Sequence, residues 1–477
     1  MTIRTRAFVT SGSASAIVIS LIFLGCGGSA DAEQPAADAG GQDSSADTQP
    51  PKDAGHDTSP RDTAVEHVPK APRCVVGPDG DAGVDAVAEV ATDALGETPS
   101  DADADFDSGE GPDAPDAAID APAPYVPVQV VDSGGRVLRA PRIVPITYDS
   151  DPNRLDVEDF VASVGCTPYW RAVSEEYGIG QAVTGTPIHL ADAPPTTISD
   201  AGIEKWLRTQ LSAGSPGWER PTPDTIYAVY YPSSTTVHLG SSTSCARFDG
   251  FHKSFTLADG TTVVYAVMVD CNDDVDDVTG VSSHEIIEAS TDPEPFAAPT
   301  YQHVDDAHGV YGLSTGSEVG DLCETDPRAI FHPTGYPFAV QRSWSNRASL
   351  GKHDPCVPAQ AGTYFNVALE LFDTVSTGFT FSDTIGVRIP VGESRTITLQ
   401  LYADGPIDPW SLSARDISGE SPHLSFSFAK STGSDGDRIA LTITKKSEST
   451  ALGAEPFVVV SSSGTGRRTF AYGLVGH

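Results

Sequence analysis

Residues 27–124 limit what this chain can fold into, because they contain few of the side chains from which a core is built. Asp, Ala, Pro, Gly and Ser dominate this stretch, and 23 acidic side chains face 4 basic ones, so it carries a charge of −19 out of −37 for the whole chain. Such a segment buries too little apolar surface to offset its chain entropy, and its like charges repel one another. We predict that 27–124 is a disordered acidic linker. The acidity also argues against a nucleic-acid partner.

The N-terminus predicts export. Two arginines precede a short apolar run, AIVISLIFL at 16–24, which is too short to span a bilayer as a helix. The run leads into Leu-Gly-Cys, which resembles the lipobox of bacterial lipoproteins, although Phe23 stands where Leu is usual. We expect 1–26 to be a lipoprotein signal peptide, Cys26 to carry the lipid, and the protein to lie in the cell envelope at the outer membrane or cell surface. The alternative is an ordinary secretory signal with a chance cysteine, which would give a secreted protein.

Six cysteines remain beyond Cys26, and an even number in an exported chain favours disulfide bonds. The sequence does not choose among the pairings of these six, which are Cys74, Cys166, Cys245, Cys271, Cys323 and Cys356. Because Cys74 lies in the acidic linker, we expect only five of them in the globular part. A CxxC pair does not occur, which argues against a cysteine-rich zinc site.

The pattern of the remaining chain changes once, from mixed strands and helices to short alternating runs. Strands are predicted at 142–149, 225–232 and 261–270, and helices at 157–165, 169–178 and 201–211. From PAQAGTY at 358–364 onward, short alternating runs follow one another, separated by turn residues at intervals typical of a β-sandwich. We therefore predict an α/β or α+β zincin-like domain over 125–360. An all-β sandwich over 361–477 should follow it as a structural or binding appendage.

The first of these domains contains a motif with metal-binding chemistry, VSSHEIIEASTDP at 281–293. On a helix, side chains four residues apart lie on one face, so His284 and Glu288 can reach one metal ion together, with Glu285 beside them. In HExxH zinc proteases the two histidines bind zinc and the intervening glutamate is the general base. Here Glu288 replaces the second histidine, and a carboxylate is an acceptable zinc ligand. The alternative is an ordinary helix face that happens to carry these side chains.

A metal ion needs a further protein ligand, and SEVGDLC at 317–323 offers Glu318 and Asp321. The separation between Glu288 and Glu318 is similar to the gluzincin layout, in which a glutamate on a following helix completes the site. Rival ligands lie between the two motifs in YQHVDDAH, namely His303, Asp305, Asp306 and His308. Zinc is the expected ion, and Ca²⁺ or Mn²⁺ is the alternative, since a histidine with two carboxylates can also hold these ions.

These motifs together resemble a family of secreted bacterial proteins. HEIIEASTDP, EVGDLC, VQRSWSN and the closing Cys356 follow its pattern HE-(L/Y)-AE-A-x-TDP and E-I-(G/A)-D-x-C, and CARFDGFHKSF matches an element upstream. The family is regarded as metalloprotease-like, and the arrangement is distantly similar to the plant phosphate-induced, EXORDIUM-like secreted proteins. The resemblance covers about 125–357, and it marks as the site His284, Glu285, Glu288, Glu318 and Asp321. The plant relatives lack the HExxE residues, so the fold does not by itself imply catalysis. For His252 in FHKSF, a surface or core-edge histidine is the preferred interpretation.

Two functions of different classes follow. The first is a lipid-anchored, zinc-dependent hydrolase, a peptidase in which Glu285 takes a proton from metal-bound water and returns it to the leaving amine. The second is a non-catalytic surface lipoprotein that binds a glycan or a protein, with any metal structural. The expected partners are therefore a membrane, through the N-terminal lipid, and a protein or glycan substrate or ligand.

Overall fold

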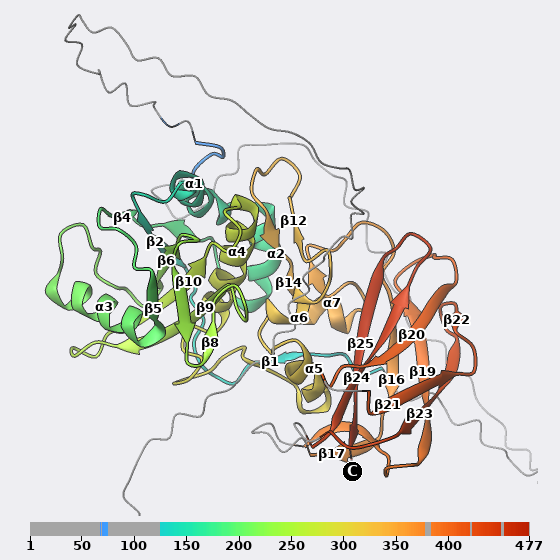
Figure 1. Ribbon diagram of the computed structural model, residues 1–477. Helices are drawn as coiled ribbons and strands as arrows, with labels where there is room; N and C mark the ends of the chain where they lie inside the picture. Colours follow the sequence, from blue (N-terminus) through green and yellow to red (C-terminus); the bar gives the residue numbers. More distant parts are fainter. Residues whose placement is uncertain are drawn as a thin grey trace, which may run out of the picture.

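The computed structural model of the chain describes residues 67, 69–74, 125–376, 383–419, 422–449 and 453–476. The predicted signal peptide, Cys26 and most of the acidic linker lie outside the described residues. Within this part of the chain, no helix is both long and apolar enough to cross a membrane. Figure 1 shows a region of mixed helices and strands followed by a region built of strands alone.

The first region is organised around a six-stranded, mostly parallel sheet. Strand β2 pairs in parallel with β3, β4 and β6, β6 pairs in parallel with β10, and β9 closes one edge as an antiparallel strand. The three strands predicted from the sequence are β2, β6 and β10, and their near-complete burial explains their continuous apolar runs. The strands are β2 (Arg142–Tyr148), β3 (Val183–Thr184), β4 (Ile188–Leu190), β6 (Thr225–Tyr231), β9 (Gly250–Thr256) and β10 (Thr262–Val269).

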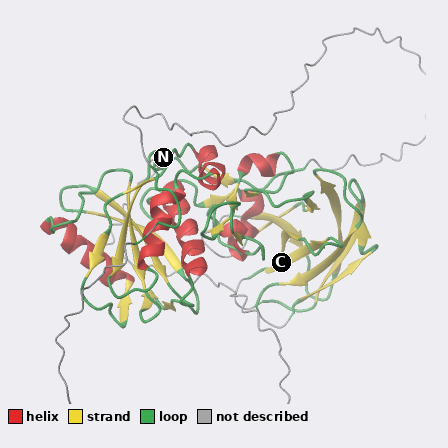
Figure 2. Ribbon diagram, turned by 90° about the horizontal axis from the view of Figure 1, so that it is seen from above, coloured by secondary structure: helices red, strands yellow, loops and turns green. Residues whose placement is uncertain are grey.

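Helices cover both faces of this sheet, as Figure 2 shows. On one face, the core joins alternate residues of β6 and β10 to helices α1 (Arg154–Val164), α2 (Pro168–Ser174) and α4 (Val275–Thr291). On the other face, α3 (Asp200–Ala213) packs with the opposite set of side chains. A small sheet of β5 (Thr197–Ser199), β7 (Thr236–Leu239) and β8 (Ser242–Thr243) accompanies α3.

Helix ends follow the local sequence. After α2, one 3-10 turn (Glu175–Tyr177) leads to Gly178, whose φ of 75° is the left-handed conformation that the sequence places at this stop. Helix α4 begins after Asp274, whose side chain accepts a hydrogen bond from the Asp276 amide, and it ends at Thr291, two residues before a proline.

Short elements connect α4 to the second region. Among them β13 packs against α4, and together they contain the SEVGDLC and RSWSN segments. In chain order they are β11 (His303–Val304, paired with β1, Val130–Val131), a 3-10 turn (Asp306–His308), α5 (Gly309–Ser314), α6 (Asp321–Glu324), β12 (Ile330–Phe331), β13 (Val340–Gln341), β14 (Ser343–Trp344), α7 (Asn346–Leu350) and β15 (Cys356–Val357).

The second region consists of two sheets that enclose one core, which is the expected β-rich sandwich. The four-stranded sheet contains β16 (Phe365–Glu370), β19 (Ser394–Ala403), β23 (Arg438–Lys445) and β21 (Leu424–Phe428). The six-stranded sheet contains β17 (Asp373–Val375), β18 (Thr384–Arg388), β25 (Arg468–Gly476), β24 (Glu455–Ser462), β20 (Trp410–Asp416) and β22 (Thr432–Gly433).

The six cysteines among the described residues form three disulfides, Cys74–Cys166, Cys245–Cys271 and Cys323–Cys356. The expectation that Cys74 lies outside the globular part is wrong, because the Cys74 amide also donates to the Ala162 carbonyl of α1.

The prediction of disorder over 27–124 likewise does not hold for the short described segment that ends at Cys74, which lies beside α1 in Figure 1. Its basic side chains meet acidic ones of the helix: His67 Nε2 is 2.7 Å from an Asp159 carboxylate oxygen, and Lys70 Nζ is 2.6 Å from Asp156. A composition averaged over the whole linker hides this local basic cluster.

Candidate metal centre

Helix α4 presents a polar stripe to strand β9 and to the SEVGDLC loop. Its apolar side chains, among them Ile286, Ile287 and Ala289, enter the core against the sheet. Glu285 and Glu288 are nevertheless buried, at 5 % and 3 % exposure. Buried carboxylates require partners, and neighbouring elements supply them.

Glu288 is the centre of the cluster. Its Oε1 accepts hydrogen bonds from the backbone amides of Gly320 and Asp321, each 3.1 Å long. Its Oε2 lies 3.1 Å from His284 Nε2. A Cβ atom at position 320 would lie 2.8 Å from Oε1 and 2.9 Å from His284 Nδ1, so this close approach of the loop requires the glycine. The loop thus fixes one carboxylate oxygen and leaves the other for the imidazoles.

His284 lies on one side of Glu288, together with Asp321. Its Nε2 is 3.7 Å from Asp321 Oδ1, while Asp321 Oδ2 accepts from the backbone amides of Ser317 and Glu318 at 3.1 and 3.3 Å. On the opposite side of the ring, His284 Nδ1 is 2.8 Å from Gln341 Nε2. The same amide nitrogen lies 3.0 Å from the Gly320 carbonyl oxygen. The structure therefore brings together three of the residues predicted as ligands.

His252, on strand β9, lies on the other side of Glu288. Its Nδ1 is 3.5 Å from Glu285 Oε2 and 3.8 Å from Glu288 Oε2. Its Nε2 is 3.1 Å from the Asp292 carbonyl oxygen and 3.5 Å from Glu318 Oε1. Glu318 therefore lies beside His252, whereas Asp321 lies beside His284.

His252 is not a surface residue, since only 7 % of it is exposed; it lies on the edge strand and contacts Glu285, Glu288, Glu318 and the Asp292 carbonyl. The sequence FHKSF contains a pattern from which the position of His252 could have been inferred. Residues alternate between the two faces of a strand, so His252 lies on the face opposite to Phe251 and Phe255, which pack in the α3-side core. The sequence did not show that α4 covers the His252 face.

The described part of the chain contains three groups of side chains that could hold a metal ion. Within each group, the potential ligand atoms all lie within 4.8 Å of one another. Two share Glu288, namely His252 with Glu285 and Glu288, and His284 with Glu288 and Asp321. The third contains Cys245, Asp249 and Cys271, but its cysteines form a disulfide.

The rival ligands do not belong to these groups. His308 Nδ1 is 2.8 Å from Asp305, His303 belongs to strand β11, and the convergent groups contain none of the four, Asp306 included.

Negative charge dominates this cluster. Burial raises the pKa of Glu285, and together with the neighbouring carboxylates it raises those of Glu318 and Asp321 well above their usual values. For Glu288, burial opposes ionisation, but the two imidazoles outweigh it and lower its pKa. Burial also opposes protonation of His252, yet the nearby glutamates raise its pKa.

The pKa of His284 is raised more strongly than that of His252. Burial opposes its protonation, but Glu288 and the other carboxylates raise its pKa well above the usual value.

The residues fit a divalent cation. Five carboxyl groups surround two imidazoles, and Glu285 Oε2 is buried without a hydrogen-bond partner. Burial and the neighbouring carboxylates raise the pKa values of Glu318 and Asp321 well above their usual range. Imidazole nitrogen and carboxylate oxygen are ligands that Zn²⁺ and Mn²⁺ accept. A cation would compensate this buried charge.

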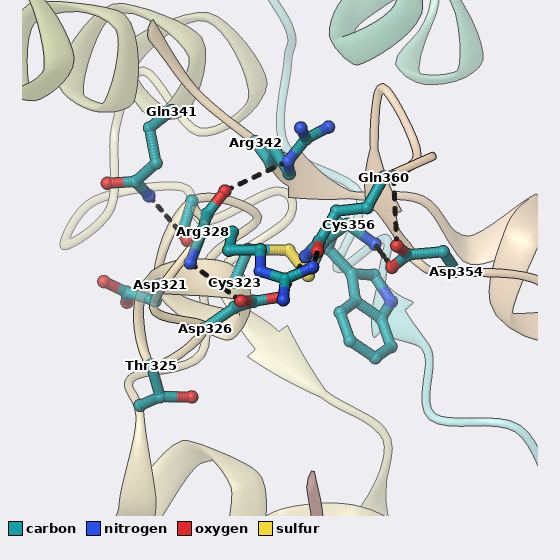
Figure 3. The surroundings of a disulfide bond; sticks show 12 residues. Asp321, Cys323, Thr325, Asp326, Arg328, Gln341, Arg342, Asp354, Cys356 and Gln360 are labelled. Carbon is teal, nitrogen blue, oxygen red and sulfur yellow. Dashed lines mark hydrogen bonds between the residues drawn. A yellow bond between two sulfur atoms is a disulfide. The ribbon is translucent and has the colours of Figure 1, made fainter. Parts of the chain in front are cut away.

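The loop that contributes Asp321 is covalently fixed. Cys323, two residues further along, is joined to Cys356, and Figure 3 shows Asp321 and Gln341 in the surroundings of this bond. The residues that hold Glu288 and His284 therefore belong to one cross-linked substructure.

Comparisons with known proteins place the chain in no family. No protein-family model matches it, and no curated protein matches it. Among solved structures, a FixG-related protein from Vibrio parahaemolyticus is 7 % identical over 23 % of this chain and 94 % of its own, with a TM-score of 0.17. The Ig1-2 module of the Drosophila receptor protein tyrosine phosphatase DLAR is 16 % identical over 23 % of this chain and 47 % of its own, with a TM-score of 0.14. These scores support no statement about fold or function.

Proposed function

We propose that this chain is a divalent-cation-dependent hydrolase of the cell envelope, with a zincin-like α/β domain, that cleaves peptide bonds. The observation that supports it is the convergence of two imidazoles and buried carboxylates on Glu288, whose Oε1 is fixed by two amides and whose Oε2 lies within 3.8 Å of both histidines. Lipidation of Cys26 would hold the enzyme at the membrane.

The HEIIE motif assigns roles within this cluster. His284, Glu288 and Asp321 would hold the cation, with Glu318 as the alternative acid, and Glu285 would accept the proton. A bound Zn²⁺ would polarise the scissile carbonyl and make water a stronger acid. Gln341 orients the His284 ring, and the Ser317 and Glu318 amides orient Asp321.

Access favours one side of the cluster. The side chains of Glu318, His284 and Asp321 are 18 %, 13 % and 13 % exposed. Those of Glu285, His252 and Glu288 are 7 %, 4 % and 3 % exposed. A substrate carbonyl would therefore approach from the side of the SEVGDLC loop.

The test uses the purified full-length chain. Its zinc content is measured by mass spectrometry, and hydrolysis is followed with fluorescently labelled casein before chelation, after chelation and after Zn²⁺ is restored. We expect about one cation per chain, activity that follows the cation, and loss of activity in Glu285→Gln. The matched control is His332→Ala, since this half-exposed histidine pairs with Asp276 outside the cluster. A wild-type chain that binds no divalent cation would overturn the proposal.

The deep burial of Glu285 favours a second candidate, a non-catalytic surface lipoprotein that binds a protein or glycan and holds a structural cation. In that case chelation lowers the unfolding temperature, while casein and peptide libraries remain uncut at every cation load.

A further inference from the structure

We infer that His252 Nδ1, Glu285 Oε2 and Glu288 Oε2 hold the cation, and that His284 lies beside Glu288 without binding the metal. This inference rests on the cation of the proposed function. It replaces the imidazole ligand that the HEIIE motif suggests with a histidine from the edge strand β9.

The first argument concerns the hydrogen on His284. A metal-binding histidine must be neutral, and a neutral ring carries hydrogen on only one nitrogen. One atom of the Gln341 amide lies 3.0 Å from the Gly320 carbonyl oxygen and 2.8 Å from His284 Nδ1. A carbonyl oxygen only accepts, so this amide atom is the nitrogen, and it donates to Nδ1 as well. Neutral His284 therefore carries its hydrogen on Nε2.

That hydrogen occupies the nitrogen which would have to bind the cation. His284 Nε2 faces Glu288 Oε2 at 3.1 Å and Asp321 Oδ1 at 3.7 Å. Both are close contacts between a ring nitrogen that carries hydrogen and a carboxylate oxygen. Metal-binding histidines almost always donate their other N–H group to a carboxylate or carbonyl, whereas the other nitrogen of His284 meets an amide N–H₂.

His252 shows the opposite arrangement. Its Nε2 is 3.1 Å from the Asp292 carbonyl oxygen, which can only accept, so Nε2 carries the hydrogen. The lone pair of neutral His252 is then on Nδ1, the nitrogen that faces Glu285 and Glu288. This is the orientation in which a backbone carbonyl fixes a metal-binding imidazole.

The distances also fit a cation. His252 Nδ1 is 3.5 Å from Glu285 Oε2 and 3.8 Å from Glu288 Oε2, which is longer than a normal hydrogen bond. Ligands bound at about 2.0–2.2 Å in tetrahedral geometry lie roughly 3.4 Å apart. Glu285 Oε2 is buried and accepts no hydrogen bond. One nitrogen and two carboxylate oxygens favour Zn²⁺ or Mn²⁺ over Ca²⁺, which prefers oxygen ligands alone.

Strand β9 is shaped for this contact. A Cβ atom at Gly250 would lie 2.7 Å from both Glu285 Cγ and Glu285 Oε1, so the glycine lets the helix approach the strand that carries His252. On this assignment Glu285 is a ligand, and the proton acceptor of the proposed hydrolysis is then Glu318 or Asp321, on the more exposed side.

The test compares His252→Gln with His284→Gln in the full-length chain. After chelation and dialysis, Zn²⁺ affinity is measured by competition with a fluorescent zinc indicator, and folding is checked by circular dichroism. We expect His252→Gln, which removes a ligand, to lose about 100-fold or more in affinity, at or beyond the upper end of the loss that outer partners cause. His284→Gln, which changes a neighbour of Glu288 and removes no ligand, should lose about 10-fold, the lower end of the loss that outer partners of ligands cause.

Each outcome decides a question. If His284→Gln loses as much affinity as His252→Gln, or more, His284 is a ligand and the inference fails while the proposed function stands. If His252→Gln does not fold, Glu285→Gln decides, because the inference requires it to weaken Zn²⁺ binding by at least about 10-fold, and unchanged binding would refute it. A wild-type chain that binds no divalent cation overturns the proposed function itself.

Discussion

Replacing Arg467 by Met should destabilise the protein by about 3 kcal/mol, because it leaves a buried carboxylate without its counter-charge. Arg467, directly before β25, lies 2.6 Å from Asp354 Oδ2 in the α/β region, and both side chains are about 95 % buried. The guanidinium also donates to the carbonyl oxygens of Gly362 and Thr363. The pair therefore joins the two regions of the chain.

The structure sets the size of this effect. Breaking a buried ion pair on one side costs about 3–5 kcal/mol. Asp354 keeps two acceptor bonds, from the amides of Cys356 and Gln360, and a cavity of about 70 Å³ beside the pair has room for water. Both features place the loss at the lower end of the range.

The assay is urea unfolding followed by fluorescence, with Asp354→Asn and the double variant completing a mutant cycle. With a slope of about 1–3 kcal/mol per molar urea, the midpoint should fall by roughly 1–3 M. The double variant should recover part of the loss, since it contains no unpaired buried charge. Arg208→Met is the control: it breaks a partly exposed helical pair with Glu204 and a guanidinium hydrogen bond to the Thr256 carbonyl, and it should cost about 1 kcal/mol or less.

The pH dependence has a defined sign. Burial raises the pKa of Asp354, and Arg467 partly opposes that rise. Without Arg467 the pKa in the folded chain rises further above its unfolded value, so the folded chain binds the proton more tightly and gains stability as pH falls. The deficit of Arg467→Met should be largest near pH 7 and smaller near pH 5. A deficit that matches the Arg208 control, or that grows on acidification, would refute the reasoning.

Two further predictions concern the site and the anchor. Gly320→Ala should lower cation affinity by about 10-fold or more, because the new Cβ would lie 2.8 Å from Glu288 Oε1, whereas Gly464→Ala, with open space around it, should leave affinity unchanged in the same indicator titration. Cys26→Ser should release the protein from the membrane fraction and remove the lipid mass from the mature N-terminus, and a Ser variant that still needs detergent would contradict lipidation.

Much of the fold could be predicted from the sequence because burial sets the pattern of apolar residues along each strand. The central strands β2, β6 and β10 are continuous apolar runs, and β19 alternates along TITLQL, since one face enters the core. Strand β20 carries the same pattern, with Trp410 and Leu412 buried and Ser411 and Ser413 exposed. The order of strands in the sheet depends on long-range pairing and leaves no local trace.

In the candidate site, too, local spacing could be predicted from the sequence, whereas contacts between distant segments could not. The helical spacing of His284 and Glu288 is a local property, and the sequence showed it. His252 comes from an antiparallel edge strand 32 residues before His284, and its part in the site depends on which helix covers that strand. The choice between the two histidines depends on Gln341 and on the Asp292 carbonyl, whose positions only the three-dimensional structure provides.

The Cys74–Cys166 bond changes how far a lipid at Cys26 could hold the folded body from a membrane. The linker alone suggests a tether of about 100 residues, or roughly 330 Å when fully extended. The disulfide moves the attachment point to Cys74, 48 residues beyond Cys26, and so limits the reach to roughly 160 Å. Residues 75–124 then belong to a ring closed by the disulfide, and they lie outside the direct covalent path from Cys26 to the folded body. A protease that cuts within this ring leaves the body attached, whereas a cut between Cys26 and Cys74 sets it free.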